Sequence, residues 1–162
     1  MKIAICGHGR CGKDTASNWL RDHTSLCYHG STSEAAAELV FSKIKDEFGY
    51  QTVAECFQDR HNHRKLWASL IWKHNQPDGL TLYRGMLVDG DILNGIRRAP
   101  ELSALRQNAM IDLVVWIERD VPDDPSLEMD SGIADVIIPN NGTFDDLYER
   151  LYRFAKVAGV YK

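Results

Sequence analysis

The sequence predicts a three-layer α/β fold in which a largely parallel sheet of about five strands lies between layers of helices. Short apolar runs alternate along the chain with amphipathic segments of helical period, as in folds built from strand–helix–strand units. Residues 111–117 are almost continuously apolar, which is typical of a parallel strand that is covered on both faces. At 162 residues the chain is expected to form a single domain, 1–162.

The first strand is predicted over residues 3–6, which are all apolar. A helix follows after a glycine-rich turn, because Ala16, Trp19 and Leu20 recur at helical spacing. Residues 26–29 indicate a second short strand, which the polar stretch 30–33 ends.

The middle of the chain is predicted to be helical. Ser31, Thr32 and Ser33 offer caps for a helix over residues 35–44. Asp59 can cap a stronger helix over residues 60–72. The other predicted elements of this part are a break at 49–52, a helical turn over 53–57, a turn at 75–79 and a helix over 80–88.

The last part returns to strands. Residues 91–94 read as a buried strand, and Pro100 suits the first turn of the helix that carries Leu102 and Leu105. The elements that complete the chain are the strand 111–117, a polar segment over 118–132, a strand over 134–138 and a helix from 143 to about 157. Ligands bind at the carboxyl edge of such sheets, so the loops that follow the strands should converge on one cleft.

The turn after the first strand has the pattern of a phosphate-binding loop. Its residues are Gly7, His8, Gly9, Arg10, Cys11, Gly12, Lys13, Asp14 and Thr15. The three glycines can adopt backbone angles closed to other residues, so that N–H groups curl around an anion at a helix N-terminus. We expect these residues to bind phosphate groups, with Lys13 facing solvent until it reaches the terminal phosphates as a catalytic charge. The alternative is a glycine-rich helix start that binds nothing.

Position 14 departs from the usual loop pattern. Asp14 stands where Ser or Thr normally offers a hydroxyl to Mg²⁺, and Thr15 comes one place later. Asp14 could hold Mg²⁺ through water, or Thr15 could take a phosphate contact. Both residues are therefore candidates for the metal site.

Arginines supply the candidate acceptor site. Arg60 and Arg64 are four apart, so on one helix they would share a face and grip a phosphate; a solvated basic helix start is the alternative. Arg97 follows a predicted central strand, where two parallel hydrogen bonds can hold a phosphate during catalysis. None of the three has an obvious carboxylate partner in the sequence, and no carboxylate is securely catalytic.

Arg119 lies at the end of the strongest strand, in a segment long and polar enough to close over a nucleotide. An arginine on such a lid would supply charge as phosphate transfers, which makes Arg119 a catalytic candidate. The alternative is a surface loop in which Arg119 pairs with Glu118 or Asp120.

Composition limits the partners and the compartment. The net charge of −4 argues against a protein that coats nucleic acid. Four cysteines are scattered without a C-x-x-C pair, which indicates a reducing cytoplasm, that of the host if the protein is viral. Met1 leads directly into the first strand and no apolar run approaches membrane-spanning length, so we expect no signal peptide and no membrane partner. The protein is expected to be a monomer or homodimer.

Four stretches together resemble the phage deoxynucleoside monophosphate kinases in order and spacing: residues 7–15, 94–101, 115–119 and 134–147. The resemblance implies a P-loop kinase fold and transfer of the γ-phosphate of ATP, with Mg²⁺, to a deoxynucleoside monophosphate. By the same resemblance Lys13 binds ATP phosphates, Arg97 contacts the substrate region, and Asn140 or Asn141 lies near the donor base. Gly95 stands where the family often has an acidic residue, so no metal or base role is carried over to that position.

Other functions stay open. The acceptor should bind in the middle of the chain, residues 55–84, which departs from the family. A related phage group, similar to thymidylate kinases, phosphorylates the hydroxymethyl group of 5-hydroxymethyluracil in DNA. Asp14 favours a third reading, a nucleotide-binding regulator without turnover. A P-loop hydrolase switch is disfavoured, because the chain has no water-positioning glutamine motif and no guanine-selecting N-K-x-D stretch.

Overall fold

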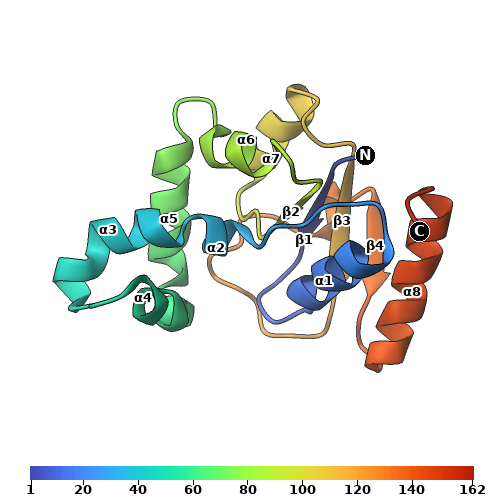
Figure 1. The fold of residues 1–162 in the computed structure, drawn as a ribbon. Helices are drawn as coiled ribbons and strands as arrows, with labels where there is room; N and C mark the ends of the chain where they lie inside the picture. The colour runs from blue at the N-terminus through green and yellow to red at the C-terminus, as the bar shows by residue number, and fades with distance from the viewer.

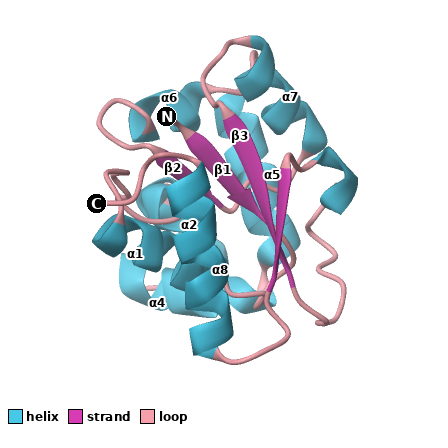
Figure 2. Cartoon of the chain, turned by 90° about the vertical axis from the view of Figure 1, so that its right-hand side faces the viewer, coloured by secondary structure: helices cyan, strands magenta, loops and turns pink.

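The computed structural model describes residues 1–162, and a parallel sheet lies at its centre. The strands are β1 (Ile3–Cys6), β2 (Ile92–Asn94), β3 (Leu113–Glu118) and β4 (Val136–Pro139). Their order in the sheet is β2-β1-β3-β4, and every neighbouring pair is parallel. Figure 2 shows β2, β1 and β3 side by side. The predicted α/β class with a parallel sheet is therefore confirmed.

The sheet has four strands, where the sequence predicts about five. Residues 26–29, expected to be the second strand, form none. Only Cys27 pairs there: its carbonyl accepts from the N–H groups of Asp91 at 2.8 Å and Ile92 at 3.2 Å. Leu26 and Tyr28 still pack into the core. The segment thus covers the edge beside β2 with its side chains, but it adds no ladder of backbone bonds.

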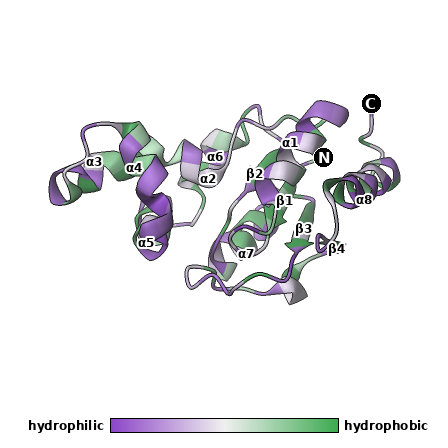
Figure 3. Cartoon of the chain, turned by 90° about the horizontal axis from the view of Figure 1, so that it is seen from below, coloured by the Kyte–Doolittle hydropathy of each residue, from purple (hydrophilic) through white to green (hydrophobic).

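Helices cover both faces of the sheet, because successive side chains of a strand point to opposite faces. Ile3 and Ile5 of β1 pack in a cluster with side chains of α1 (Lys13–His23) and α8 (Phe144–Val157). Ala4 and Cys6 pack in another with α6 (Thr81–Met86) and α7 (Ala99–Gln107). In Figure 3 the strands are coloured apolar, whereas α8 carries an apolar and a polar side.

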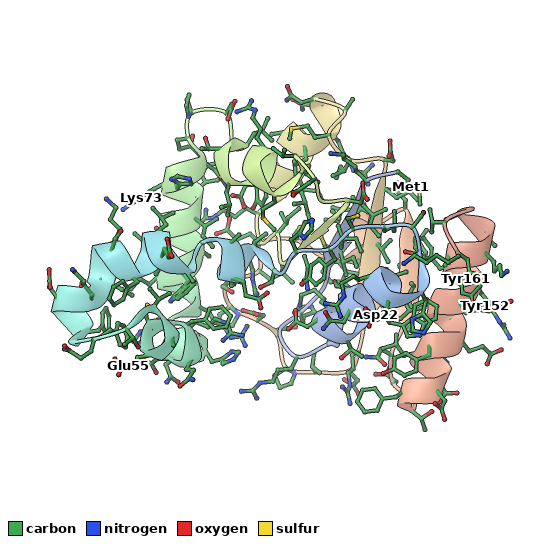
Figure 4. All side chains as sticks on the ribbon, in the orientation of Figure 1. Met1, Asp22, Glu55, Lys73, Tyr152 and Tyr161 are labelled. Atoms are coloured by element: carbon green, nitrogen blue, oxygen red, sulfur yellow. The ribbon has the colours of Figure 1, made fainter.

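A group of helices between α1 and α6 packs about a core of its own, and we call it the helical lobe, residues 32–75. Its elements are α2 (Thr32–Ala35), α3 (Ala37–Phe48), α4 (Val53–Asp59), the 3₁₀ turn η1 (Arg60–Asn62) and α5 (Arg64–Asn75). Val40, Ile44, Cys56, Trp67 and Ile71 form most of its buried cluster. Figure 1 shows the lobe on the side of the sheet away from α8. In Figure 4, Glu55 marks the lobe and Tyr152 and Tyr161 mark the opposite end.

The lobe differs from the predicted helices at two points. The helix expected over 35–44 is interrupted at Ala36, although Ser31 caps its start together with Glu34. The helix expected over 60–72 is wrong at its start, because α5 begins only at Arg64. Asp59 does not cap it. The Asp59 carboxylate instead accepts hydrogen bonds from the Tyr50 hydroxyl at 2.5 Å and the Asn62 amide at 2.6 Å.

The last two predicted helices begin close to where the sequence places them. Helix α8 begins at Phe144, where the Thr143 side chain caps it, and Pro100 lies in the first turn of α7. The long β3–β4 connection is irregular apart from the 3₁₀ turn η2 (Ser131–Ile133). None of the helices is both long and apolar enough to cross a membrane.

A buried polar contact joins the lobe to the sheet layers. Glu101, at the start of α7, is 2% exposed and accepts a hydrogen bond of 2.7 Å from the Asn75 amide at the end of α5. The Asn75 side-chain oxygen in turn accepts from the backbone N–H of Leu82 at 2.8 Å. Burial raises the pKa of Glu101, even though hydrogen bonds from Asn75 and Tyr83 act in the opposite direction.

Candidate functional site

The turn between β1 and α1 is shaped by two kinds of glycine. Gly7 and Gly12 adopt φ angles of 138° and 99°, which side chains rarely tolerate. Gly9 is not left-handed, but a Cβ there would lie 2.7 Å from Asp124 Oδ2. Arg10 takes the remaining positive φ of the turn, 67°. Gly9 is therefore needed because the side chain of Asp124 approaches it closely. The sequence alone suggests a different reason, the freedom of its backbone angles.

Lys13 does not face solvent as expected. It is 8% exposed, and its Nζ donates to the carbonyls of Gly7 at 2.9 Å and His8 at 2.6 Å. Burial lowers its pKa, and the nearby Cys11 thiol opposes that shift. The turn thus folds its own carbonyl oxygens around the ammonium group, because a buried charge needs partners.

Two pockets adjoin this turn, and both are lined by Arg10, Lys13 and Asp14. The first, which we call the arginine pocket, is also lined by Arg60, Arg64, Trp67, Asn94, Arg97 and Ser126. The second, the asparagine pocket, is also lined by Gly12, Thr15, Arg119, Asn140, Gly142, Thr143 and Phe144. The three shared residues therefore lie where the two pockets meet.

The arginine pocket is strongly cationic. Its lining includes four arginines and Lys13, but a single carboxylate, that of Asp14. Arg60 and Arg64 do not share a helix face as predicted, because Arg60 belongs to η1 and Arg64 begins α5. The 3₁₀ turn nevertheless brings both to the same pocket as Arg97, which follows β2. Such a cluster of guanidinium groups is suited to a phosphate.

Histidine 61 belongs to the same cluster. Its Nδ1 accepts a hydrogen bond of 2.9 Å from Arg64 Nη2. Burial lowers its pKa, and so do the neighbouring charges of Arg60 and Arg64. His63 lies apart from it, 3.1 Å from the Asp59 carboxylate. His61 therefore orients Arg64 without adding a charge at neutral pH.

Asp124, in the β3–β4 connection, is the carboxylate that the sequence did not reveal. Its side chain is 3% exposed, and Oδ2 lies 2.5 Å from Arg97 Nη1 and 3.1 Å from Arg64 Nη1. Burial alone would raise its pKa, but the hydrogen bonds of Ser126 and the charge of Arg97 outweigh that effect and hold the pKa far below its ordinary value. The expectation that these arginines lack a carboxylate partner is therefore wrong for two of the three.

Asp14 is held at the meeting point of the pockets by a buried neighbour. Its Oδ1 accepts a hydrogen bond of 2.7 Å from Asn94 Nδ2, and Asn94 ends β2. The same amide donates to the Tyr28 hydroxyl at 3.2 Å, and the Asn94 side-chain oxygen is buried without a partner. Of these two pockets, Thr15 lines the asparagine pocket but not the arginine pocket. Asp14 therefore faces both pockets, and Thr15 one of them.

These hard oxygen donors fit Mg²⁺ of the kind held mainly by substrate phosphates. No group of three or more His, Cys, Asp or Glu side chains is arranged for a metal ion. Mg²⁺ in nucleotide sites commonly takes one or two protein ligands and completes its shell with phosphates and water. Asp14 has a second carboxylate oxygen that makes no hydrogen bond within the protein. One carboxylate and one hydroxyl are a sufficient protein share for such an ion.

The asparagine pocket joins the ends of β3 and β4 to the turn. Asn140 is 7% exposed, and its Nδ2 donates to the Cys11 carbonyl at 2.8 Å. Asn141 does not line the pocket; its side-chain oxygen accepts from the backbone N–H of Asp120 at 2.7 Å. Arg119 is exposed, lines the pocket and forms no ion pair, so its pairing with Glu118 or Asp120 is not observed.

No protein-family model and no curated protein matches the chain. What the site can do chemically follows from its own side chains. It offers one cationic pocket, a second pocket beside a helix N-terminus, and a lysine and a carboxylate where the two meet. This arrangement can hold two anionic groups next to each other.

Proposed function

We propose that the protein is an ATP-dependent phosphotransferase with a P-loop, which moves the γ-phosphate of ATP to a nucleotide, most simply a deoxynucleoside monophosphate. One observation carries the proposal: a pocket rich in arginine and a pocket at the start of α1 share Arg10, Lys13 and Asp14. A transferring phosphate has to pass between donor and acceptor at such a point.

ATP is the donor in this proposal. Its phosphates bind the turn 7–13, where Lys13 exchanges the carbonyls of Gly7 and His8 for phosphate oxygens. Its base and ribose occupy the asparagine pocket, where the Phe144 ring is 68% exposed and the free Arg119 guanidinium is close. An exposed ring and a guanidinium plane can both stack on a base.

Mg²⁺ would be held through Asp14, with Thr15 as the other candidate. When bound, the ion neutralises charge on the β- and γ-phosphates. The protein's own share is to keep the Asp14 carboxylate in place, which the hydrogen bond from Asn94 does.

The acceptor lies in the arginine pocket, where Arg60, Arg64 and Arg97 bind its phosphate. An oxygen of that phosphate forms a bond to the γ-phosphorus, the bond between that phosphorus and the β–γ bridging oxygen breaks, and ADP leaves. The attacking oxygen is already ionised at neutral pH, so the step needs no base. Lys13 and Arg97 stabilise the charge that the transferring group carries between the pockets.

The deoxy sugar, the phage source and action in the host cytoplasm are parts of the proposal that rest on the resemblance to phage deoxynucleoside monophosphate kinases. The overall charge of −4 supports a free nucleotide over DNA, since it offers little long-range attraction for a polyanion.

A second candidate acceptor is the hydroxymethyl group of 5-hydroxymethyluracil in DNA, and Asp14 is the observation that favours it. A hydroxyl must lose its proton when it attacks phosphorus, and Asp14 is a carboxylate held at the meeting point of the pockets. The arginines would then bind backbone phosphates. Activity on DNA should fall steeply between low and moderate salt, because counterions compete for those arginines.

The test is an acceptor screen. ATP consumption is measured without acceptor, with each free deoxynucleoside monophosphate, and with single- and double-stranded DNA that contains 5-hydroxymethyluracil. We expect one free monophosphate to accelerate ADP formation by orders of magnitude and to yield a diphosphate. Lys13→Ala should abolish this gain, whereas Lys73→Ala, a change of an exposed lysine in α5, should not. Transfer to DNA alone would favour the second candidate. ATP binding with no acceptor-dependent turnover would leave the regulator.

A further inference from the structure

Asp124 contacts three parts of the site that come from different regions of the chain. Its Oδ2 meets Arg64 of the lobe and Arg97 after β2. Its backbone N–H donates to His8 Nδ1 in the glycine-rich turn at 3.2 Å. Its Oδ1 accepts from the Ser126 hydroxyl at 2.6 Å and from the Ser126 N–H at 3.1 Å. The carboxylate is thus saturated by the protein itself.

Asp124 holds the two arginines from outside the arginine pocket. Arg64, Arg97 and Ser126 line that pocket, whereas Asp124 does not. Both contacts use only Nη1 of each guanidinium, and Arg64 Nη2 is bound to His61. Nε of Arg64 and both Nε and Nη2 of Arg97 donate to no protein group. The donors that Asp124 leaves open are therefore available to a ligand.

The charge of Asp124 also lets the two arginines approach each other. Two guanidinium groups that contact one oxygen atom would repel each other strongly in a partly buried site. One carboxylate between them reduces the charge of the three groups to +1. Because the two long side chains are already ordered, a ligand binds without the loss of affinity that ordering them would cause.

We propose that Asp124 is a positioning residue for the acceptor phosphate: it fixes Arg64 and Arg97 in one arrangement before the acceptor arrives, and it ties that pair to the glycine-rich turn. This inference rests on the proposed function, since it takes the arginine pocket as the acceptor site. It adds a residue that touches neither the acceptor nor ATP. The β3–β4 connection acts here by bringing one carboxylate behind the pocket.

Asp124→Asn tests the inference, with Asp123→Asn as the matched control. The Asp123 side chain is fully exposed, and its nearest partner is His8 Nε2 at 4.0 Å. Asparagine at position 124 carries no charge, and its amide NH₂ group is a hydrogen-bond donor. That NH₂ group would face the donors that contact Asp124, which belong to the two arginines and Ser126. We expect the KM for the acceptor monophosphate to rise about tenfold to fiftyfold, with the KM for ATP within about twofold of the wild type. Asp123→Asn should leave both unchanged.

Nitrogen-15 NMR of the arginine Nε–H groups in the ligand-free protein gives a readout that does not depend on turnover. The signals of Arg64 and Arg97 should be sharp in the wild type and in Asp123→Asn, and broadened in Asp124→Asn. Inorganic phosphate, titrated in the same samples, should bind more weakly to Asp124→Asn. If the wild type turned over no acceptor at all, the proposed function would fail, and these two measurements would still decide the role of Asp124.

Unchanged arginine signals together with unchanged acceptor or phosphate affinity in Asp124→Asn would overturn the inference. Tighter phosphate binding would overturn it as well, because Asp124 would then compete with the ligand. If Asp124→Asn does not fold, Ser126→Ala replaces it. That variant removes the hydroxyl bonds to Asp124 Oδ1 and to Arg97 Nη1 at 3.1 Å, and it should shift the same signals to a smaller extent. No shift in Ser126→Ala would again count against the inference.

Discussion

Replacing Arg64 by Ala should separate acceptor binding from ATP binding. The change removes the contact of 3.1 Å with Asp124 and the contact of 2.9 Å with His61. Asp124 keeps Arg97 and both bonds from Ser126, so the buried carboxylate does not lose all its partners. We therefore expect the free energy of unfolding to fall by only about 1 to 2 kcal/mol.

The expected loss in acceptor affinity is larger than the loss in stability. One charge-assisted contact to the acceptor phosphate is worth about 1.5 to 3 kcal/mol, which corresponds to roughly 10- to 150-fold in Kd. ATP affinity should hardly change, because Arg64 does not line the asparagine pocket. The residual donors of Arg60 and Arg97 should keep binding measurable.

Isothermal titration calorimetry with the acceptor monophosphate, and separately with a non-hydrolysable ATP analogue, measures the two affinities. Denaturant unfolding measures the stability. Arg153→Ala is the matched control, because Arg153 is an exposed arginine of α8 whose only ion pair is with Glu149. The reasoning is refuted if folded Arg64→Ala binds the acceptor within about twofold of the wild type, or if both ligands weaken equally.

Three further predictions concern the lysine, the metal and the buried contact at the end of the lobe. Lys13→Ala should lower turnover by about two orders of magnitude or more in the acceptor assay. It should destabilise the fold by only about 1 kcal/mol, because the removal of a buried charge offsets the loss of its two hydrogen bonds. Near-normal turnover would contradict the kinase proposal. Asp14→Ala should raise the Mg²⁺ concentration needed for half-maximal activity and Asp14→Ser should restore it, whereas identical Mg²⁺ titrations would reduce Asp14 to a helix-start residue. Burial raises the pKa of Glu101 in the folded state, so the folded protein holds the Glu101 proton more tightly than the unfolded chain does. The protonated side chain therefore contributes to stability below the ordinary pKa of 4.5, and this contribution is lost as pH rises through the pKa of Glu101 in the folded protein. Glu101→Gln should therefore be more stable than the wild type at pH 8, by about 1.4 kcal/mol for each unit of the pKa shift, and denaturant unfolding across pH 4 to 8 that showed parallel curves for both proteins would contradict this.

The sequence predicts a structural element correctly where a single local feature, such as a run of apolar residues, determines it. The apolar run of β3, the strand β1 with its glycine-rich turn, and the start of α8 all lie close to where the sequence predicts them. Each depends on neighbours in the chain, such as a continuous run of buried side chains or a hydroxyl three residues before an acid. Convergence of the strand-end loops on adjoining pockets followed from the parallel topology.

Features that depend on distant contacts were missed. Residues 26–29 are apolar enough for a strand, but only Cys27 finds backbone partners at the edge beside β2. Asp59 looks like a helix cap, yet Tyr50 and Asn62 take its carboxylate. Asp124 is one of several acids in a proline-bearing loop, and nothing nearby distinguishes it. Its two arginine partners lie 27 and 60 positions away, a relation that no local pattern carries.

The helical lobe contributes Arg60 and Arg64 to the arginine pocket, and it packs around a hydrophobic cluster that is separate from the two clusters on the faces of the sheet. Trp67 and Ile71 belong to that cluster and also line the arginine pocket. A change in how the lobe packs is therefore also a change in the shape of the pocket. Substitutions at Trp67 or Ile71 would therefore reshape the arginine pocket from the side of the lobe without changing a residue of the sheet clusters.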